Sequence, residues 1–166
     1  MILVIVGLLV VLGIVGRMVQ RRVAQGVAGG FLSALTGGKV KVGGDSNKVT
    51  YKSDDGEFSF QEGGKLPEGF PSDFPIYPGA KITSSWTSND DDSKGISIVW
   101  ETSDALTKVA DYYKENIEAK GWKITASFSQ EDTTTYSFEK GTASGFVGVG
   151  KGEADKTNIS VTISVK

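Results

Sequence analysis

The N-terminal part of the chain has the hydrophobic pattern of a long helix. Residues 1–16 contain no polar side chain, and the first charged residue is Arg17. From Val19 to Leu35 apolar residues recur every four positions, which draws one stripe along an α-helix. Gly37-Gly38 is expected to end the helix. The pattern predicts one continuous helix of about 35 residues, and a break at Gly29-Gly30 is the alternative, because glycine disfavours a helix interior.

Beyond this helix, short runs alternate apolar and polar residues, as strands with one buried face do. The sequence Asp54-Asp55-Gly56 between two such runs is typical of a hairpin turn. The runs predict strands over residues 39–42, 48–53, 57–61, 81–86, 95–102, 122–129, 134–140, 146–151 and 158–165.

All four prolines of the chain lie between Leu66 and Ala80. Each proline fixes its own φ and favours an extended conformation of the residue before it. The segment is therefore predicted to be a stiff, extended connector. We expect its apolar side chains to pack on the neighbouring core, namely those of Phe70, Phe74, Ile76 and Tyr77.

A second, shorter helix is predicted between the fifth and sixth strands. Thr102 or Ser103 is expected to cap its N-terminus, with Asp104 in the first turn. Gly121 follows Lys120 and is expected to end it. The buried stripe is predicted to comprise Leu106, Val109, Ala110, Tyr113 and Ile117.

These elements predict an α+β fold: a long N-terminal hydrophobic helix followed by a strand-rich head, with a mainly antiparallel sheet and one packed helix. The predicted divisions are a helix for assembly or membrane anchoring over 1–38, a β-hairpin region over 39–65, a Pro-rich connector over 66–80 and an α+β head domain over 81–166. Strand order cannot be derived from the pattern.

The composition restricts the chemistry that the chain can carry out. It has no cysteine and no histidine, so thiol catalysis, Ser-His-Asp triads and the commonest zinc ligands are excluded. Eighteen Lys and Arg residues balance 20 Asp and Glu residues, and no basic segment suits a nucleic acid. We expect no enzyme activity, no cofactor, no bound metal and no nucleic-acid partner.

Several polar and aromatic groups have two interpretations. The turn Asn89–Ser93 contains three aspartates but lacks the alternating ligands of a calcium loop, so a solvated hairpin is favoured. The sequence GFVGVGKG contains G-x-G-x-G, but no helix follows to bind a phosphate. Aromatic residues favour a core between helix and sheet, and a ligand-stacking platform is the alternative; they are Trp86, Trp100, Trp122, Tyr112 and Tyr113.

The charges around the N-terminal helix give conflicting signals about location. Its apolar part is near the short end of the about 20 residues that span a bilayer. Arginines follow the apolar part of the helix and no basic residue precedes it. Because basic residues flank a membrane helix on its cytoplasmic side, this would place the rest of the chain in the cytoplasm. A body rich in Ser, Thr and Gly resembles an exported protein instead. A removed leader or a missing Lys-rich start would reconcile the two, and we expect an extracellular or cell-surface protein, or a single-pass membrane protein.

Two resemblances extend this interpretation. The motif FPSDFPIYPGAK, followed by ETSDALTKVADYYKENIEAKGW, resembles an uncharacterised module of bacterial envelope proteins, which implies no activity and no site residues. The layout of a long apolar helix before a β-rich head resembles type IV pilins and related archaeal filament subunits. That resemblance implies helices bundled in a filament core, although Ile5 stands where bacterial pilins carry a glutamate.

The sequence thus predicts a structural subunit of an extracellular filament, with copies of itself as partners and a membrane as the site before assembly or as a permanent anchor. The alternatives are a single-pass envelope protein of unknown role, and a domain that binds a glycan or another unknown surface ligand through Trp86, Trp100 or Tyr112. Glycines would let the helices approach closely, and arginines would lie at the edge of the core. The predicted assembly or membrane residues are Ile2, Leu3, Ile5, Gly7, Leu9, Leu12, Gly13, Val15, Arg17, Arg21 and Arg22.

Overall fold

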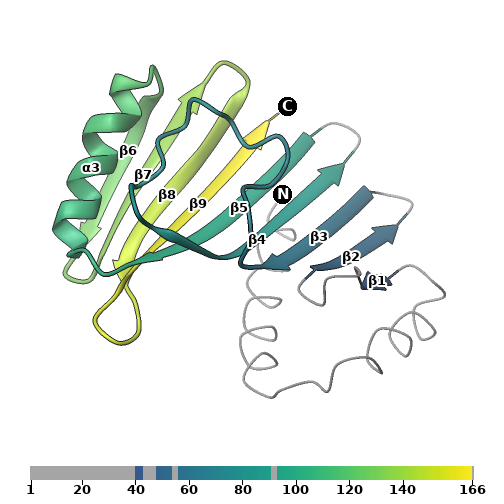
Figure 1. Cartoon of the computed structure of the whole chain (residues 1–166). Coiled ribbons are helices and arrows are strands. Elements are labelled where there is room, and N and C mark those ends of the chain that lie inside the picture. The colour runs from purple at the N-terminus through teal and green to yellow at the C-terminus, as the bar shows by residue number, and fades with distance from the viewer. Residues whose placement is uncertain (1–39, 43–47, 54–55, 91–92, 166) are drawn as a thin grey trace. The chain divides into compact units, whose positions relative to one another are not determined.

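A computed structural model of the chain describes residues 40–42, 48–53, 56–90 and 93–165 (Figure 1). These residues belong to a compact unit that extends from Lys39 to Lys166. Within the described residues the unit contains nine strands and one helix. The residues predicted to drive assembly, from Ile2 to Arg22, lie outside the described part of the chain.

All nine strands belong to one antiparallel sheet, in the order β1-β2-β3-β4-β5-β9-β8-β7-β6. The first five strands follow one another across the sheet, and the last four return from the far edge to β5 (Figure 1). The strands are β1 (Val40–Val42), β2 (Lys48–Ser53), β3 (Gly56–Glu62), β4 (Lys81–Asp90), β5 (Ser93–Thr102), β6 (Lys123–Gln130), β7 (Thr133–Lys140), β8 (Ala143–Lys151) and β9 (Thr157–Val165).

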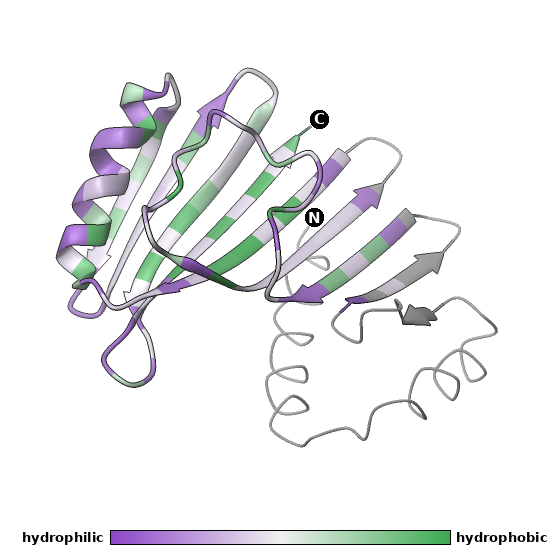
Figure 2. Ribbon diagram, in the orientation of Figure 1, coloured by the Kyte–Doolittle hydropathy of each residue, from purple (hydrophilic) through white to green (hydrophobic). Residues whose placement is uncertain are grey.

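The alternating pattern of the sequence explains which face of the sheet is buried. On the central strand β9, Ile159, Val161 and Ile163 are fully buried, and the residues between them are partly exposed. Ile96, Ile98 and Trp100 on β5 and Val147 and Val149 on β8 are buried at the same two-residue spacing, and apolar residues are visible along both strands (Figure 2). On β5 the intervening Ser97 is also buried, and its hydroxyl lies 2.6 Å from that of Thr162 on β9.

The single described helix, α3 (Leu106–Ala119), covers the β6, β7 and β8 end of the sheet (Figure 1). The predicted stripe is confirmed, because Val109, Ala110, Tyr113 and Ile117 are buried and Leu106 packs against the same core. The predicted cap is wrong. Ala105 precedes the helix and makes no side-chain capping bond. The Thr102 hydroxyl instead accepts from the backbone N–H of Asp104 in the turn before it.

The segment between β3 and β4, residues 63–80, crosses the sheet on the side that α3 covers, and we call it the strap (Figure 1). Phe74 and Tyr77 are buried, and Phe70 packs against the core, as predicted. The prediction for Ile76 is wrong, since 37 % of that residue is exposed. The predicted extended conformation is wrong, because backbone hydrogen bonds close turns at Phe70, Phe74 and Ala80. The strap is part of the folded unit, and its aromatic side chains form the layer between sheet and helix.

The predicted fold, a long N-terminal hydrophobic helix followed by a strand-rich head, needs correction. The predicted helix lies outside the described residues, and the expected division between the hairpin strands and the sheet of the head is wrong. The described residues form one continuous antiparallel sheet with one helix, and β3 pairs directly with β4, so the hairpin strands extend the main sheet. Local periodicity could not reveal this pairing, because the strap separates the two strands in sequence. In the described part of the chain, no helix is long and apolar enough to cross a membrane. The predicted domain boundaries stay predictions.

Candidate functional site

A groove of about 700 Å³ lies where the end of the strap meets α3. This volume is within the range of small-ligand pockets, about 300–1,000 Å³. We call it the α3 groove. Side chains of the strap, of the turn before α3 and of α3 itself line it: Tyr77, Pro78, Asp104, Thr107, Lys108, Asp111, Tyr112 and Glu115.

The spacing of residues on α3 explains why this face is polar. Lys108, Asp111 and Glu115 recur at intervals of three and four, so they lie on one side of the helix. Val109 and Tyr113 lie on the buried side against the sheet. One amphipathic helix therefore contributes to the core with one face and to the groove with the other.

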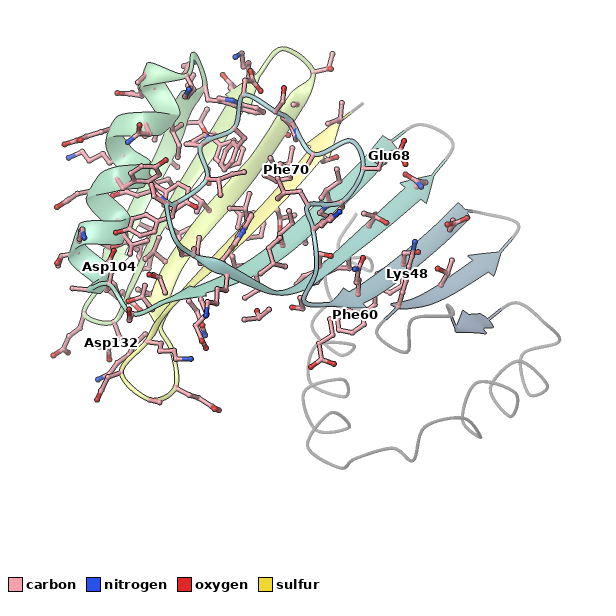
Figure 3. The ribbon with its side chains drawn as sticks, viewed as in Figure 1. Lys48, Phe60, Glu68, Phe70, Asp104 and Asp132 are labelled. Carbon is pink, nitrogen blue, oxygen red and sulfur yellow. The ribbon has the colours of Figure 1, made fainter. Side chains whose placement is uncertain are left out.

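Asp104 connects the strap to the helix at one end of the groove (Figure 3). Its Oδ2 accepts a hydrogen bond of 2.6 Å from the Tyr77 hydroxyl and one of 3.1 Å from the Lys108 ammonium. Its backbone carbonyl accepts a 2.7 Å bond from the Thr157 hydroxyl on β9. The carboxylate thus lies at the junction of strap, helix and sheet.

These contacts change how the three groups titrate. The hydrogen bond from Tyr77, followed by that from Lys108, lowers the pKa of Asp104. Burial, together with the hydrogen bond to Asp104 and its charge, raises the pKa of Tyr77. The hydrogen bond to Asp104 and its charge raise the pKa of Lys108. At neutral pH the network therefore holds a carboxylate, a protonated phenol and an ammonium group.

Tyr112 forms an aromatic wall of the groove together with Tyr77. The two ring centroids are 5.0 Å apart in an edge-to-face arrangement. The Tyr112 hydroxyl donates a 2.8 Å bond to the Ile76 carbonyl, which holds the strap against α3. Partial burial raises the pKa of Tyr112, so its hydroxyl stays protonated at neutral pH.

The groove carries a negative charge. It contains three carboxylates and one ammonium group, and that ammonium is paired with Asp104. Asp111 and Glu115 form no ion pair with any other described residue. Both can accept hydrogen bonds from a ligand, and both favour a ligand with a positive charge. Among the described residues, no group of three or more acidic or other ligating side chains is placed to hold a metal.

The aromatic residues singled out in the sequence are divided between core and groove. Trp100, Trp122 and Tyr113 belong to the core, as the favoured interpretation predicts. Trp86 lies on β4 opposite Phe60 of β3 and does not line the groove. Of these five residues only Tyr112 lines the groove, so the alternative of a platform built from several of them is wrong. Sequence reasoning missed Tyr77 and Asp104, whose 27-residue separation hid their contact.

The described residues thus form an antiparallel sheet with a covering helix and an adjacent groove. A family model described as START domain-like matches residues 82–165, from β4 to β9 and including α3. The chain belongs to this START domain-like family. No curated protein and no solved structure matches the chain.

This membership corrects both resemblances and the function drawn from them. The chain is a member of a START domain-like family, so the resemblance to an envelope module and to pilins is wrong. The interpretation as a filament subunit is also wrong, because the family indicates a ligand-binding domain. The pilin resemblance rests on the layout before residue 81, whereas the family model matches the strands and the helix after it.

Proposed function

We propose that the unit from Lys39 to Lys166 is a non-enzymatic binding domain that holds a small ligand in the α3 groove. Membership of the START domain-like family supports a binding role. The observation that carries the proposal is the groove itself, with a volume of about 700 Å³ and two packed tyrosine rings. It also has two carboxylates, those of Asp111 and Glu115, that form no ion pair with any other described residue. Concave sites of this size with few oriented polar groups are typical of ligand pockets.

The groove favours a ligand that donates hydrogen bonds or carries an amine. Asp111 and Glu115 lie one helical turn apart and provide two acceptors. The ring of Tyr112 provides an apolar surface beside them, against which an amine or an aromatic ring can pack. Hydrogen bonds from Tyr77 and Lys108 to the Asp104 carboxylate fix the end of the groove.

Amide NMR on the ¹⁵N-labelled full chain tests the proposal, with benzylamine and phenylacetate as probes of opposite charge. We expect benzylamine to shift the resonances of Asp111, Tyr112 and Glu115 in a saturable manner. Phenylacetate should bind more weakly than benzylamine. Added salt should weaken the binding of benzylamine, because salt screens the attraction between partly solvated charges.

The matched variants are Asp111→Asn with Glu115→Gln, against Glu153→Gln with Asp155→Asn in the turn between β8 and β9. Both pairs remove two negative charges, but only the first pair lies in the groove. Benzylamine binding should fall in the first double variant and stay unchanged in the second. Equal loss in both, or shifts confined to residues outside the groove, would refute the proposal.

The remaining expectations have no test in the described residues. Association with other copies of the chain or with a membrane stays a prediction, and so does an extracellular or cell-surface location. The absence of catalytic activity is part of our proposal.

A further inference from the structure

β6 forms one edge of the sheet in the described part of the chain (Figure 1). It pairs with β7 on one side, and no strand of the described residues pairs with its other side. Such an edge presents a row of backbone N–H and C=O groups to which another strand can be added. β1, at the opposite edge, has only three residues, whereas β6 has eight. β6 is therefore the longer of the two edges.

The features that protect an edge strand from pairing are confined to the start of β6. Lys123 is its only charged residue, and the register against β7 shifts between Ile124 and Ala126. Charges and bulges of this kind disfavour pairing with another chain. From Ala126 to Gln130 the pairing with β7 is regular, and this segment contains no charged residue and no proline. The second half of β6 is therefore an unprotected edge.

This half of β6 is exposed on both faces of the sheet. Every residue from Thr125 to Gln130 is exposed, so neither α3 nor the strap covers them. Phe128 is 60 % exposed, the largest fraction among the exposed large hydrophobic residues that the structure describes. Its partner on β7 is Thr135, which lies between the buried Thr134 and Tyr136, so Phe128 lies on the face away from α3. An exposed phenylalanine on an unprotected edge favours association.

The sequence of β6 is complementary to itself when two copies of the strand run antiparallel. If Ser127 of one copy lies opposite Ser127 of the other, Phe128 lies opposite Ala126 of the other copy. Both of these residues lie on the same face, because they are two positions apart in the strand. A large side chain thus lies beside a small one. The arrangement has two-fold symmetry, so the contact occurs twice.

Opposite charges also meet in this arrangement. Lys123 lies at one end of β6, and Glu131 and Asp132 form the turn at its other end. Antiparallel pairing brings Lys123 of each copy to the acidic turn of the other. Lys123 forms a 3.1 Å ion pair with Glu139, but its side chain is 75 % exposed and such surface pairs are weak. Glu131 and Asp132 are exposed and form no ion pair with another described residue.

We propose that β6 is the contact surface for a second copy of this chain, with the two β6 strands paired antiparallel about a two-fold axis at Ser127. Backbone hydrogen bonds provide the attraction, the contact between Phe128 and Ala126 sets the register, and the charges set the direction. A contact through one edge strand is smaller than a standard interface, so the association is weak, with a monomer at about 10 µM and a dimer near 1 mM. The inference goes beyond the proposed function, because no β6 residue lines the α3 groove.

Cysteine crosslinking of the full chain tests both the pairing and its register, because the native chain has no cysteine. In Ser127→Cys the two thiols lie on opposed residues, whose Cα atoms are about 4.5–5.5 Å apart in an antiparallel pair. A disulfide requires Cα atoms roughly 4.4–6.8 Å apart, so mild oxidation with diamide should give a covalent dimer. Ser129→Cys is the matched control, because the register places Ser129 opposite Thr125 and separates its two thiols by roughly 14 Å.

We expect Ser127→Cys to crosslink at least about tenfold faster than Ser129→Cys, because only the first geometry suits a disulfide. Adding Phe128→Lys to Ser127→Cys should abolish this advantage, since lysine disfavours pairing at an edge. Adding Phe146→Lys should leave it unchanged, because Phe146 is also exposed but lies on β8, away from the edge.

A charge reversal tests the proposed direction. Lys123→Glu should slow the crosslinking of Ser127→Cys, and the further changes Glu131→Lys and Asp132→Lys should restore it. Lys65→Glu, at an exposed residue of the strap, is the control and should have no effect.

Equal crosslinking rates for Ser127→Cys and Ser129→Cys would overturn the inference, because association through any other part of the chain does not depend on the register of β6. Equal effects of Phe128→Lys and Phe146→Lys would also overturn it. The comparison of the two cysteine variants remains decisive if a lysine variant does not fold. The two proposals fail separately, because benzylamine reports on the α3 groove and crosslinking reports on β6.

Discussion

Replacing Phe74 by alanine tests how firmly the strap is packed. The ring is 3 % exposed and contacts four aromatic side chains, Phe70, Tyr113, Trp122 and Phe138. Truncation of a buried phenylalanine lowers the free energy of unfolding by about 3–5 kcal/mol, through lost burial and the cavity left behind. We expect that loss here, which is a large part of the about 5–15 kcal/mol that stabilises a domain.

Urea denaturation followed by tryptophan fluorescence measures this loss. With a slope of roughly 2 kcal/mol per molar urea, the transition midpoint should fall by on the order of 2 M. Phe128→Ala is the matched control, because Phe128 is 60 % exposed and its loss should change the free energy by less than about 1 kcal/mol. A loss below about 1 kcal/mol for Phe74→Ala would show that the strap is loosely attached, contrary to the packing described above.

Three further predictions concern other parts of the molecule. Tyr77→Phe should raise the pKa of Asp104 in an NMR titration, because it removes the main contact that lowers this pKa; an unchanged pKa would contradict the network. In the wild type, Asp104 stabilises the fold above its unfolded pKa, and this contribution disappears as pH falls through the lowered folded pKa. The free energy of unfolding should therefore fall less steeply with decreasing pH in Tyr77→Phe than in the wild type. Gly145→Ala should lower the free energy of unfolding by roughly 3 kcal/mol or more, because the new Cβ would lie 2.0 Å from the Thr162 backbone oxygen on β9. In the control Gly148→Ala the nearest atom to the new Cβ is 3.8 Å away, so the change should be less than about 1 kcal/mol. Equal thermal midpoints for the two variants would contradict the strand register. Removal of residues 1–38 should leave a folded monomer, and an unfolded circular dichroism spectrum would refute an independent unit.

The sequence pattern predicts elements that depend on neighbouring residues. The stripe of α3 follows from spacing within one helix, and Gly121 ends that helix with φ +78° as glycine commonly does. The β2–β3 hairpin follows from a turn sequence next to two alternating runs. In each case the physical cause acts over a few residues, so it is visible in the sequence.

Features that depend on distant residues could not be predicted in this way. β5 pairs with β9, which places Ile98 opposite Val161 across an intervening helix and three strands. The α3 groove depends on Tyr77 reaching Asp104, and the packing of the strap on the sheet depends on Phe74 reaching Phe138. The sequence indicates Tyr112 only as a member of an aromatic platform, because the strap that completes the groove beside it comes from another part of the chain.

Native mass spectrometry of the full chain, incubated with a small-molecule extract and desalted, tests the central claim most directly. We expect a noncovalent one-to-one complex with a small molecule in the wild type. The complex should be lost in the Asp111→Asn, Glu115→Gln double variant and retained in the Glu153→Gln, Asp155→Asn control. A wild-type chain that carries no ligand from any extract, together with amide resonances in the α3 groove that do not respond to benzylamine, would contradict the account.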